Sequence, residues 1–229
     1  MASIDLNADV GEGMATDEAL LGLITSANVA CGFHAGDAAT MAWVSAFAAE
    51  RGVVVGAHVG YRDPESFGRR PLDVAAHVVA SETEVQIEAL RLAGGDVRYV
   101  KPHGALYTRA THDRECAEAI VAATAGAGVG AMVGLPGSAL LASASAAGLA
   151  AVPEGFADRG YRPDGSLVPR GEPGALLGLD DAVGQGVRLA LVGSVGTLCI
   201  HGDSPGAVEL AFALSDALSS AGVALASFA

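Results

Sequence analysis

The chain has 229 residues, of which 51% are hydrophobic and 17% charged, so it can build one sizeable core and is not a disordered chain. Its 26 acidic and 13 basic residues give a formal net charge of −13, which excludes nucleic acid and anionic membrane surfaces as expected partners. Three widely spaced cysteines and the lack of a basic, apolar leader predict a reduced, cytoplasmic protein.

Apolar, β-branched runs alternate with helical patterns along the chain. Strands are predicted over residues 4–9, 28–31, 53–58, 97–103, 129–135, 149–154, 196–201 and 223–226. Helices are predicted over residues 17–24, 38–51, 74–93, 114–125, 138–147, 181–192 and 205–221, with Pro205 in the first turn of the last one. The buried face of helix 74–93 is expected to consist of Val74, Val78, Val85, Ala89 and Leu92.

One stretch of the chain, between Glu118 and Glu154, contains no charged residue and is long enough to span a bilayer. It is rich in Ala and Gly, and Pro136 and Gly137 interrupt it in the middle. We therefore interpret it as a buried strand between two helices, and we expect no association with membranes.

The regular alternation of strands and helices favours a parallel sheet covered by helices. In the first strand, Asp5, Asn7 and Asp9 share one face, and apolar residues occupy the other. Strands of an open, doubly wound sheet are usually apolar on both faces, so a repeated polar face favours a barrel with a polar interior. We predict a single-domain β/α barrel of seven or eight parallel strands over residues 1–229, with the doubly wound sheet as the alternative.

Polar side chains collect where the predicted strands end, and active sites of β/α barrels lie at that end of the strands. The candidate catalytic residues are Asp9, His58, Lys101, His103 and His201. The candidate substrate-binding residues are Asn7, Asn28, His34, Arg62, Glu154 and Asp203. Residues 155–173, rich in Gly, Pro and charge, follow a strand and are expected to lie over the barrel mouth.

Lys101 is the only lysine in the chain, because the other twelve basic residues are arginines. At a strand end it is suited to bind a substrate carboxylate or a developing oxyanion, and an exposed strand-end charge is the alternative. Asp9, His58, His103 and His201 also carry donor atoms for a metal, but the sequence has no compact metal-binding motif and leaves a bound metal open. Asp203 precedes a predicted helix and has a second interpretation as its N-cap.

The sequence resembles the LamB/YcsF family in six segments, at residues 5–13, 28–37, 56–69, 101–107, 154–170 and 200–206. The resemblance implies a barrel related to the glycoside hydrolase and deacetylase superfamily. It also implies an activity, the ATP-dependent opening of 5-oxoproline to L-glutamate, in which this chain would be the A component of a 5-oxoprolinase and would act with partner subunits B and C. Deacetylases of that superfamily carry an Asp-Asp pair and a His-x-x-x-His pattern, whereas this chain has Asn7 and Asp9 and no such histidine pair.

The implied reaction needs ATP as a co-substrate, yet the sequence contains no phosphate-binding loop with Gly-Lys-Ser or Gly-Lys-Thr. We therefore expect the ATP chemistry to rely largely on the partner subunits. This chain is expected to bind the lactam or its activated form, with Lys101 or Arg62 on the carboxylate. Asp9 and His103 are the leading acid and base candidates, and His34, His58 and His201 would position water or stabilise charge.

Two other functions remain compatible with the sequence. One is a stand-alone, metal-dependent amide hydrolase or deacetylase. The other is a subunit that binds the substrate without catalysing its conversion. The set of polar residues expected at the barrel mouth favours catalysis over both.

Overall fold

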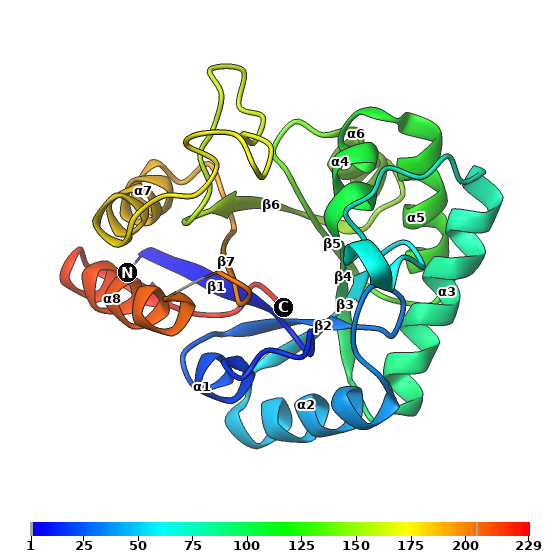
Figure 1. The fold of residues 1–229 in the computed structure, drawn as a ribbon, viewed down its shortest axis with the longest axis horizontal. Coiled ribbons are helices and arrows are strands. Elements are labelled where there is room, and N and C mark those ends of the chain that lie inside the picture. Colours follow the sequence, from blue (N-terminus) through cyan, green and yellow to red (C-terminus); the bar gives the residue numbers. More distant parts are fainter. Residues whose placement is uncertain (1, 205) are drawn as a thin grey trace.

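The computed structural model describes residues 2–204 and 206–229, and its strands form a closed barrel (Figure 1). Its strands are β1 (Ala2–Val10), β2 (Ser26–Ala30), β3 (Val54–Val59), β4 (Val97–Pro102), β5 (Ala131–Gly134), β6 (Ala150–Phe156), β7 (Thr197–His201) and β8 (Val223–Leu225). Strands β1 to β7 run parallel, and β1 pairs with both β2 and β7, which closes the ring. The short β8 pairs with residues 2–4 of β1. The predicted β/α barrel is confirmed, and its closure excludes the open sheet.

Helices surround the barrel (Figure 1). They are α1 (Asp17–Leu21), α2 (Ala38–Arg51), α3 (Ala76–Leu92), α4 (Gly104–His112), α5 (Arg114–Gly126), α6 (Ala139–Ala146), α7 (Leu179–Val192) and α8 (Ala207–Ser220), with a short 3₁₀ helix η1 (Pro64–Ser66). Local signals explain the bounds of α2: the Asp37 carboxylate accepts the N–H of Thr40 at 2.8 Å, and Gly52 ends the helix at a φ of 68°.

Two helix predictions need correction. The buried face of α3 is not the predicted one, because Val85 is 51% and Leu92 81% exposed. The helix instead buries Val79, Thr83, Gln86, Ile87 and Leu90. Gln86 is buried although it is polar, since its amide accepts the N–H of Gly60 at 2.9 Å and donates to the Gly60 carbonyl at 3.1 Å.

The second correction concerns helix α4, which was not predicted. The predicted position of Pro205, in the first turn of the last helix, lies outside the described residues.

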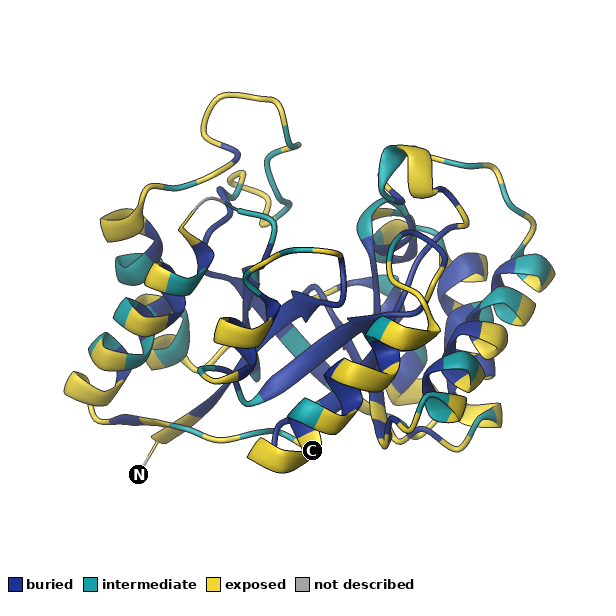
Figure 2. Cartoon of the chain, turned by 60° about the horizontal axis from the view of Figure 1, so that its bottom comes forward, coloured by how far each residue is buried: buried dark blue, intermediate teal, exposed yellow. Residues whose placement is uncertain are grey.

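The apolar core lies between the strands and the helices. Leu6, Ala8 and Val10 of β1 belong to it, and the intervening polar residues of β1 point into the lumen. Figure 2 shows this arrangement as buried strands at the centre and helices that are buried on the barrel side and exposed on the outer side. The inner face of the strands is therefore free to carry polar side chains without weakening the core.

An apolar cluster fills the other part of the lumen. Tyr99, Ala131, Val133 and Val152 form it, and Phe228 packs against Tyr99 with the ring centroids 5.1 Å apart. Gly56 leaves room for the Tyr99 ring, because a Cβ at residue 56 would lie 2.2 Å from a ring carbon.

The charge-free stretch folds as α5, β5 and α6, which is the predicted buried strand between two helices. Within the described residues, no helix combines the length and the apolar character needed to cross a membrane.

Candidate active site

The deepest polar layer of the lumen is built around Asp5. Its carboxylate accepts hydrogen bonds from the hydroxyls of Thr25 and Ser26, both at 2.6 Å, and from the hydroxyl of Thr197. Burial nevertheless raises the pKa of Asp5 above its ordinary value, because desolvation outweighs these hydrogen bonds. Asp5 thus lies on the lumen side of β1, as the sequence predicts.

The next layer connects three of the predicted substrate-binding residues. Asn28 donates to the side-chain oxygen of Asn7 at 2.6 Å and to Asp9 at 2.8 Å, and it accepts the Tyr99 hydroxyl at 2.7 Å. Asn7 in turn donates to Glu154 at 3.2 Å. These amides are fully engaged with protein groups, so they orient Asp9 and Glu154 from behind and are not available to a substrate.

Lys101 lies at the centre of the site and is buried. Its ammonium is 2.9 Å from Asp9 Oδ1, 2.8 Å from Glu154 Oε1 and 3.1 Å from Cys199 Sγ. Burial by itself lowers the pKa of Lys101, but attraction by Asp9 and Glu154 outweighs it and holds the pKa well above its ordinary value. The three N–H groups of the ammonium therefore all have protein partners.

A histidine cluster adjoins this layer. His58 Nε2 lies 3.3 Å from Asp9 Oδ2 and 2.9 Å from His103 Nδ1. Glu12 Oε1 lies 3.4 Å from His103 Nδ1 and 3.1 Å from His34 Nε2. The rings of His34 and His103 stack, with centroids 3.8 Å apart. Burial lowers the pKa of His34 to about 3, so this ring is neutral at pH 7.

The hydrogen bonds of His58 and His103 fix where their protons lie. His58 Nδ1 faces the carbonyl of Lys101 at 3.1 Å, and His103 Nε2 faces the carbonyl of Phe67 at 2.9 Å. A carbonyl only accepts, so both outer nitrogens carry hydrogen. Burial and the neighbouring histidines hold the pKa of His103 well below its ordinary value, so His103 is neutral and its Nδ1 presents a lone pair on the side of His58.

Two neighbours determine the protonation of Asp9. Burial alone would raise its pKa, but the interactions with His58 and Lys101 outweigh burial and hold it well below the ordinary value. Asp9 is therefore an ionised carboxylate that lines the cavity. Glu12 behaves in the opposite way, since burial and the charge of Asp9 hold its pKa well above the ordinary value.

His201 forms a dyad with Asp158. His201 Nδ1 lies 2.9 and 3.0 Å from the two carboxylate oxygens of Asp158, which also accepts the Ser204 hydroxyl at 3.2 Å. The Phe156 ring stacks on the imidazole at a centroid distance of 5.4 Å. His201 lines the cavity, and its Nε2 has no hydrogen-bond partner among the described residues, so that nitrogen can exchange a proton with a substrate.

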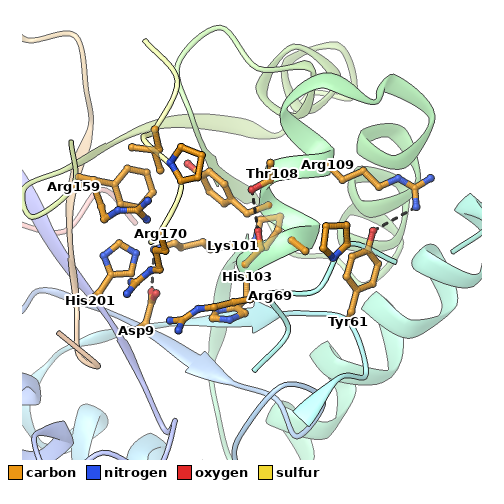
Figure 3. Close-up of a pocket in the computed structure, with 18 of the residues that line it drawn as sticks. Asp9, Tyr61, Arg69, Lys101, His103, Thr108, Arg109, Arg159, Arg170 and His201 are labelled. Atoms are coloured by element: carbon orange, nitrogen blue, oxygen red, sulfur yellow. Dashed lines mark hydrogen bonds and ion pairs between the residues drawn. The ribbon is translucent and has the colours of Figure 1, made fainter. Parts of the chain in front are cut away.

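The cavity above these residues has a volume of about 640 Å³ and an arginine-rich rim (Figure 3). Arg159 is buried and donates to two backbone carbonyls of its own loop, at 2.6 and 3.0 Å. Arg170 and Arg69 both contact Asp203, at 3.3 and 2.5 Å. Arg159 and Arg170 belong to the loop that follows β6, so the predicted loop does lie over the mouth. The rim offers several guanidinium groups to an anionic ligand.

The structure brings most of the predicted site residues together. Those that line the cavity are Asp9, His58, Lys101, His103 and His201. Those that lie buried behind them are Asn7, Asn28, His34 and Glu154. Asp203 lies at the rim, where it pairs with arginines and does not cap α8, whose N-cap is Gly206.

Arg62 is the exception, and its predicted contact with the substrate needs correction. Its side chain is 64% exposed, its guanidinium lies 3.8 Å from the centroid of the Phe33 ring, and its nearest carboxylate is Glu82 at 3.9 Å. It does not line the cavity. Its neighbour Tyr61 does line the cavity, so the chain passes the mouth here and the Arg62 side chain lies on the outer side of it.

Several residues of the site were not among the predicted ones. They are Glu12, Arg69, Asp158, Arg159 and Arg170. Glu12, Asp158 and Arg159 lie within a few residues of the ends of the predicted strands 4–9 and 149–154, and this position is the signal that identifies them. Arg69 and Arg170 lie farther into loops, where the sequence carries no comparable signal.

Among the described residues, two groups of side chains have the donor atoms for a metal ion. In each group, one ligand atom per residue lies within 4.8 Å of the others. The groups are Glu12, His34, His58 and His103, and Asp9, Cys199 and His201. The imidazole and carboxylate donors of the first group suit zinc and related divalent ions.

Fold and site together define a β/α-barrel protein with a buried lysine, a histidine cluster and a cationic rim at the carboxyl ends of its strands. Residues 4–229 match the model of the LamB/YcsF family, and the chain belongs to this family. The predicted resemblance is thereby confirmed.

Known relatives extend this result over the full chain. A protein of Streptomyces coelicolor that is named as the A component of a 5-oxoprolinase is 51% identical, with 99% of this chain and 100% of the relative covered. The crystal structure of a lactam utilization protein from Thermus thermophilus is 37% identical, with a TM-score of 0.90, over 99% of this chain and 100% of that one. A family 4 carbohydrate esterase from Streptomyces lividans is similar at a TM-score of 0.59 over 100% of this chain and 93% of that one. At 14% identity, this last likeness shows the fold alone.

Proposed function

We propose that this chain is the ring-opening A component of an ATP-dependent 5-oxoprolinase, which converts 5-oxoproline to L-glutamate together with partner subunits B and C. The observation that carries the proposal is an ionised carboxylate, Asp9, held between His58 and the buried ammonium of Lys101 beneath a cavity with an arginine rim. The names of the full-length relatives support the substrate and the multi-subunit assembly.

The substrate is a small anion, and the rim suits it. The arginines Arg69, Arg159 and Arg170 can hold its carboxylate, or the phosphoryl group of an activated lactam, through paired N–H donors. Lys101 does not take this part, because its ammonium is already engaged by Asp9 and Glu154. It fixes Asp9 in the site.

The lactam is resonance-stabilised, so we propose that it reacts in an activated form. The partner subunits transfer the γ-phosphoryl group of ATP to the lactam oxygen and release ADP. In the cavity of this chain, Asp9 takes a proton from a water that adds to the ring carbonyl carbon. The ring C–N bond then breaks, the nitrogen receives a proton from His201 Nε2, and the resulting acyl phosphate is hydrolysed by a second water to glutamate and phosphate.

His201 has a particular task in this scheme. The tetrahedral intermediate can expel phosphate, which restores the lactam and wastes ATP, or it can expel the amine, which opens the ring. Protonation of the nitrogen favours the second outcome, since a neutral amine is a far better leaving group than an amide anion. Both ring nitrogens of His103 are engaged, by His58 and by the Phe67 carbonyl, so His201 replaces it as the acid candidate.

The test is reconstitution of the full chain with its candidate partner subunits, followed by assays of glutamate and phosphate formed from 5-oxoproline and ATP. We expect turnover that needs all the subunits, and a loss of about 10²- to 10⁴-fold in kcat for Asp9→Asn. Arg98→Gln is the matched control, because Arg98 is exposed and its ion pair is with Asp96, at 3.5 Å. Full activity of the Asp9→Asn complex would refute the catalytic role.

Two other results would favour the remaining functions. Amide hydrolysis by this chain without ATP and partners would indicate a stand-alone hydrolase. Binding of 5-oxoproline in calorimetry, combined with unchanged turnover in every cavity variant, would indicate a non-catalytic binding subunit.

A further inference from the structure

We infer that His58, His103 and Glu12 form a three-ligand site for a divalent metal ion of the Zn²⁺ class, with an open coordination position on the side of Asp9. Nothing in the reaction scheme above requires this site. Two independent features carry the inference: the distances among the ligand atoms, and the groups that orient them.

The three ligand atoms are spaced as if around one ion. His58 Nε2 and His103 Nδ1 are 2.9 Å apart, and Glu12 Oε1 lies 3.4 Å from the second and 3.9 Å from the first. A circle through three points with these separations has a radius of about 2.0 Å, and zinc binds imidazole nitrogen and carboxylate oxygen at about 2.0–2.2 Å. An ion close to the plane of the three atoms would therefore reach all of them with little movement.

The second feature is the orientation of each ligand. Histidines that bind a metal nearly always donate their other N–H to a carbonyl or carboxylate. His58 does so toward the Lys101 carbonyl at 3.1 Å, and His103 toward the Phe67 carbonyl at 2.9 Å. Both inner nitrogens consequently point toward each other and toward Glu12, which is the arrangement that an ion between them requires.

His34 orients the third ligand. Its Nε2 lies 3.1 Å from the carboxylate of Glu12, and its ring stacks on His103 at 3.8 Å. His34 therefore touches two of the three ligands and is a positioning residue. Gly60 and Gly68 allow this close packing, because a Cβ at either position would lie 2.7 to 2.8 Å from a His34 atom.

The surroundings of Glu12 agree with this geometry. Lys101 pairs with Asp9 and Glu154, at 2.9 and 2.8 Å. Among the described residues, the groups within ion-pair distance of Glu12 are the histidines of the cluster. The Glu12 carboxyl group therefore has the two proposed histidine ligands and His34 as its partners in the cluster.

Two histidines and one glutamate with an open position are a known arrangement for catalytic zinc. Asp9 Oδ2 lies 3.3 Å from His58 Nε2 and borders the open side. A metal there would supply Lewis acidity beside Asp9, and this chemical role, unlike the binding itself, rests on the proposed function.

The experiment is calorimetric titration of the metal-free, full-length chain with Zn²⁺, with Mn²⁺ in parallel. We expect one ion per chain, a rise in the thermal unfolding midpoint on binding, and tetrahedral or five-coordinate absorption bands when Co²⁺ replaces zinc. Glu12→Gln should weaken binding by more than about 100-fold, and His34→Asn by about 10- to 100-fold, as expected for a ligand and for a group that orients one.

The double variant His77→Asn/His112→Asn is the matched control, because both imidazoles are exposed and lie on helices α3 and α4. It should bind the ion as the unaltered chain does. Circular dichroism of each variant separates loss of binding from loss of folding, and the ligand variant His103→Gln provides a second reading if Glu12→Gln does not fold.

The inference is overturned if the unaltered chain binds no ion, or if Glu12→Gln and His103→Gln, both folded, bind as tightly as the control. These outcomes are distinct from failure of the proposed function. Metal binding without ring opening by the complete complex would overturn the function alone. Ring opening by a chain that binds no metal would overturn the site alone.

Discussion

Replacing Lys101 by Met tests whether the buried ammonium organises the site. The substitution keeps the length of the side chain and removes the charge that contacts Asp9 Oδ1 at 2.9 Å and Glu154 Oε1 at 2.8 Å. Removing one partner from a buried ion pair costs about 3–5 kcal/mol, because the other charges remain buried without compensation. With a urea m-value of about 3 kcal/mol/M, the unfolding midpoint should fall by about 1 to 1.7 M.

Equilibrium urea unfolding of the full chain measures this change, and a double-mutant cycle assigns it to the contact. Adding Glu154→Gln to Lys101→Met removes one of the stranded carboxylates, so the double variant should be more stable than the sum of the single changes by about 1–3 kcal/mol. Arg98→Met is the control, since its exposed pair with Asp96 should contribute at most about 1 kcal/mol. A loss below about 1 kcal/mol for Lys101→Met at an unchanged m-value would refute the reasoning.

Three other substitutions test the architecture and the site. Gly56→Ala should destabilise the chain by about 1–3 kcal/mol or more, because its Cβ would lie 2.2 Å from the Tyr99 ring, whereas Gly130→Ala, which has open space, should be nearly neutral in the same urea titration. Asp5→Asn should gain stability relative to the unaltered chain as the pH rises from 4 to 7: the folded pKa of Asp5 is raised, so its contribution is present at low pH and is lost as the pH rises through that pKa. A pH-independent difference would contradict this. Asp158→Asn, which breaks the dyad with His201, should raise the ATP consumed per glutamate formed, and unchanged coupling would count against His201 as the acid.

The helices and strands could be predicted from the sequence because the residues that mark them lie within each element or next to it. Helix α2 is marked by Asp37 at its start and Gly52 at its end, and the polar face of β1 alternates strictly. Helix α4 lacks such marks, since His103 makes no side-chain cap and the helix follows β4 directly. Closure of the barrel depends on β1 pairing with both β2 and β7, a long-range property that no local pattern contains.

The interior of α3 shows a related difficulty. An apolar stripe predicts the buried face of a helix only if the polar residues of that helix are exposed, and Gln86 is a buried exception. Its side-chain amide bonds both the N–H and the carbonyl of Gly60, so burying the amide leaves no hydrogen-bonding group unpaired there. Valines such as Val85 are then left exposed, and the sequence alone gives no reason to prefer one face over the other.

Only part of the candidate site could be predicted from the sequence, because of the topology of the barrel. In a parallel barrel each strand contributes one or two side chains to the mouth, so partners are separated by a whole β/α unit. His58 and His103 touch at 2.9 Å although 45 residues separate them, and Glu12 joins them from the end of β1. A search for metal ligands that lie a few residues apart in the sequence therefore does not find this site. The informative pattern is the residue type at the inward position where each strand ends, which brought together Asp9, His58, Lys101, His103 and His201. Loop residues such as Arg69 and Arg170 escape that rule, because their positions depend on contacts within loops and not on the pleat of a strand.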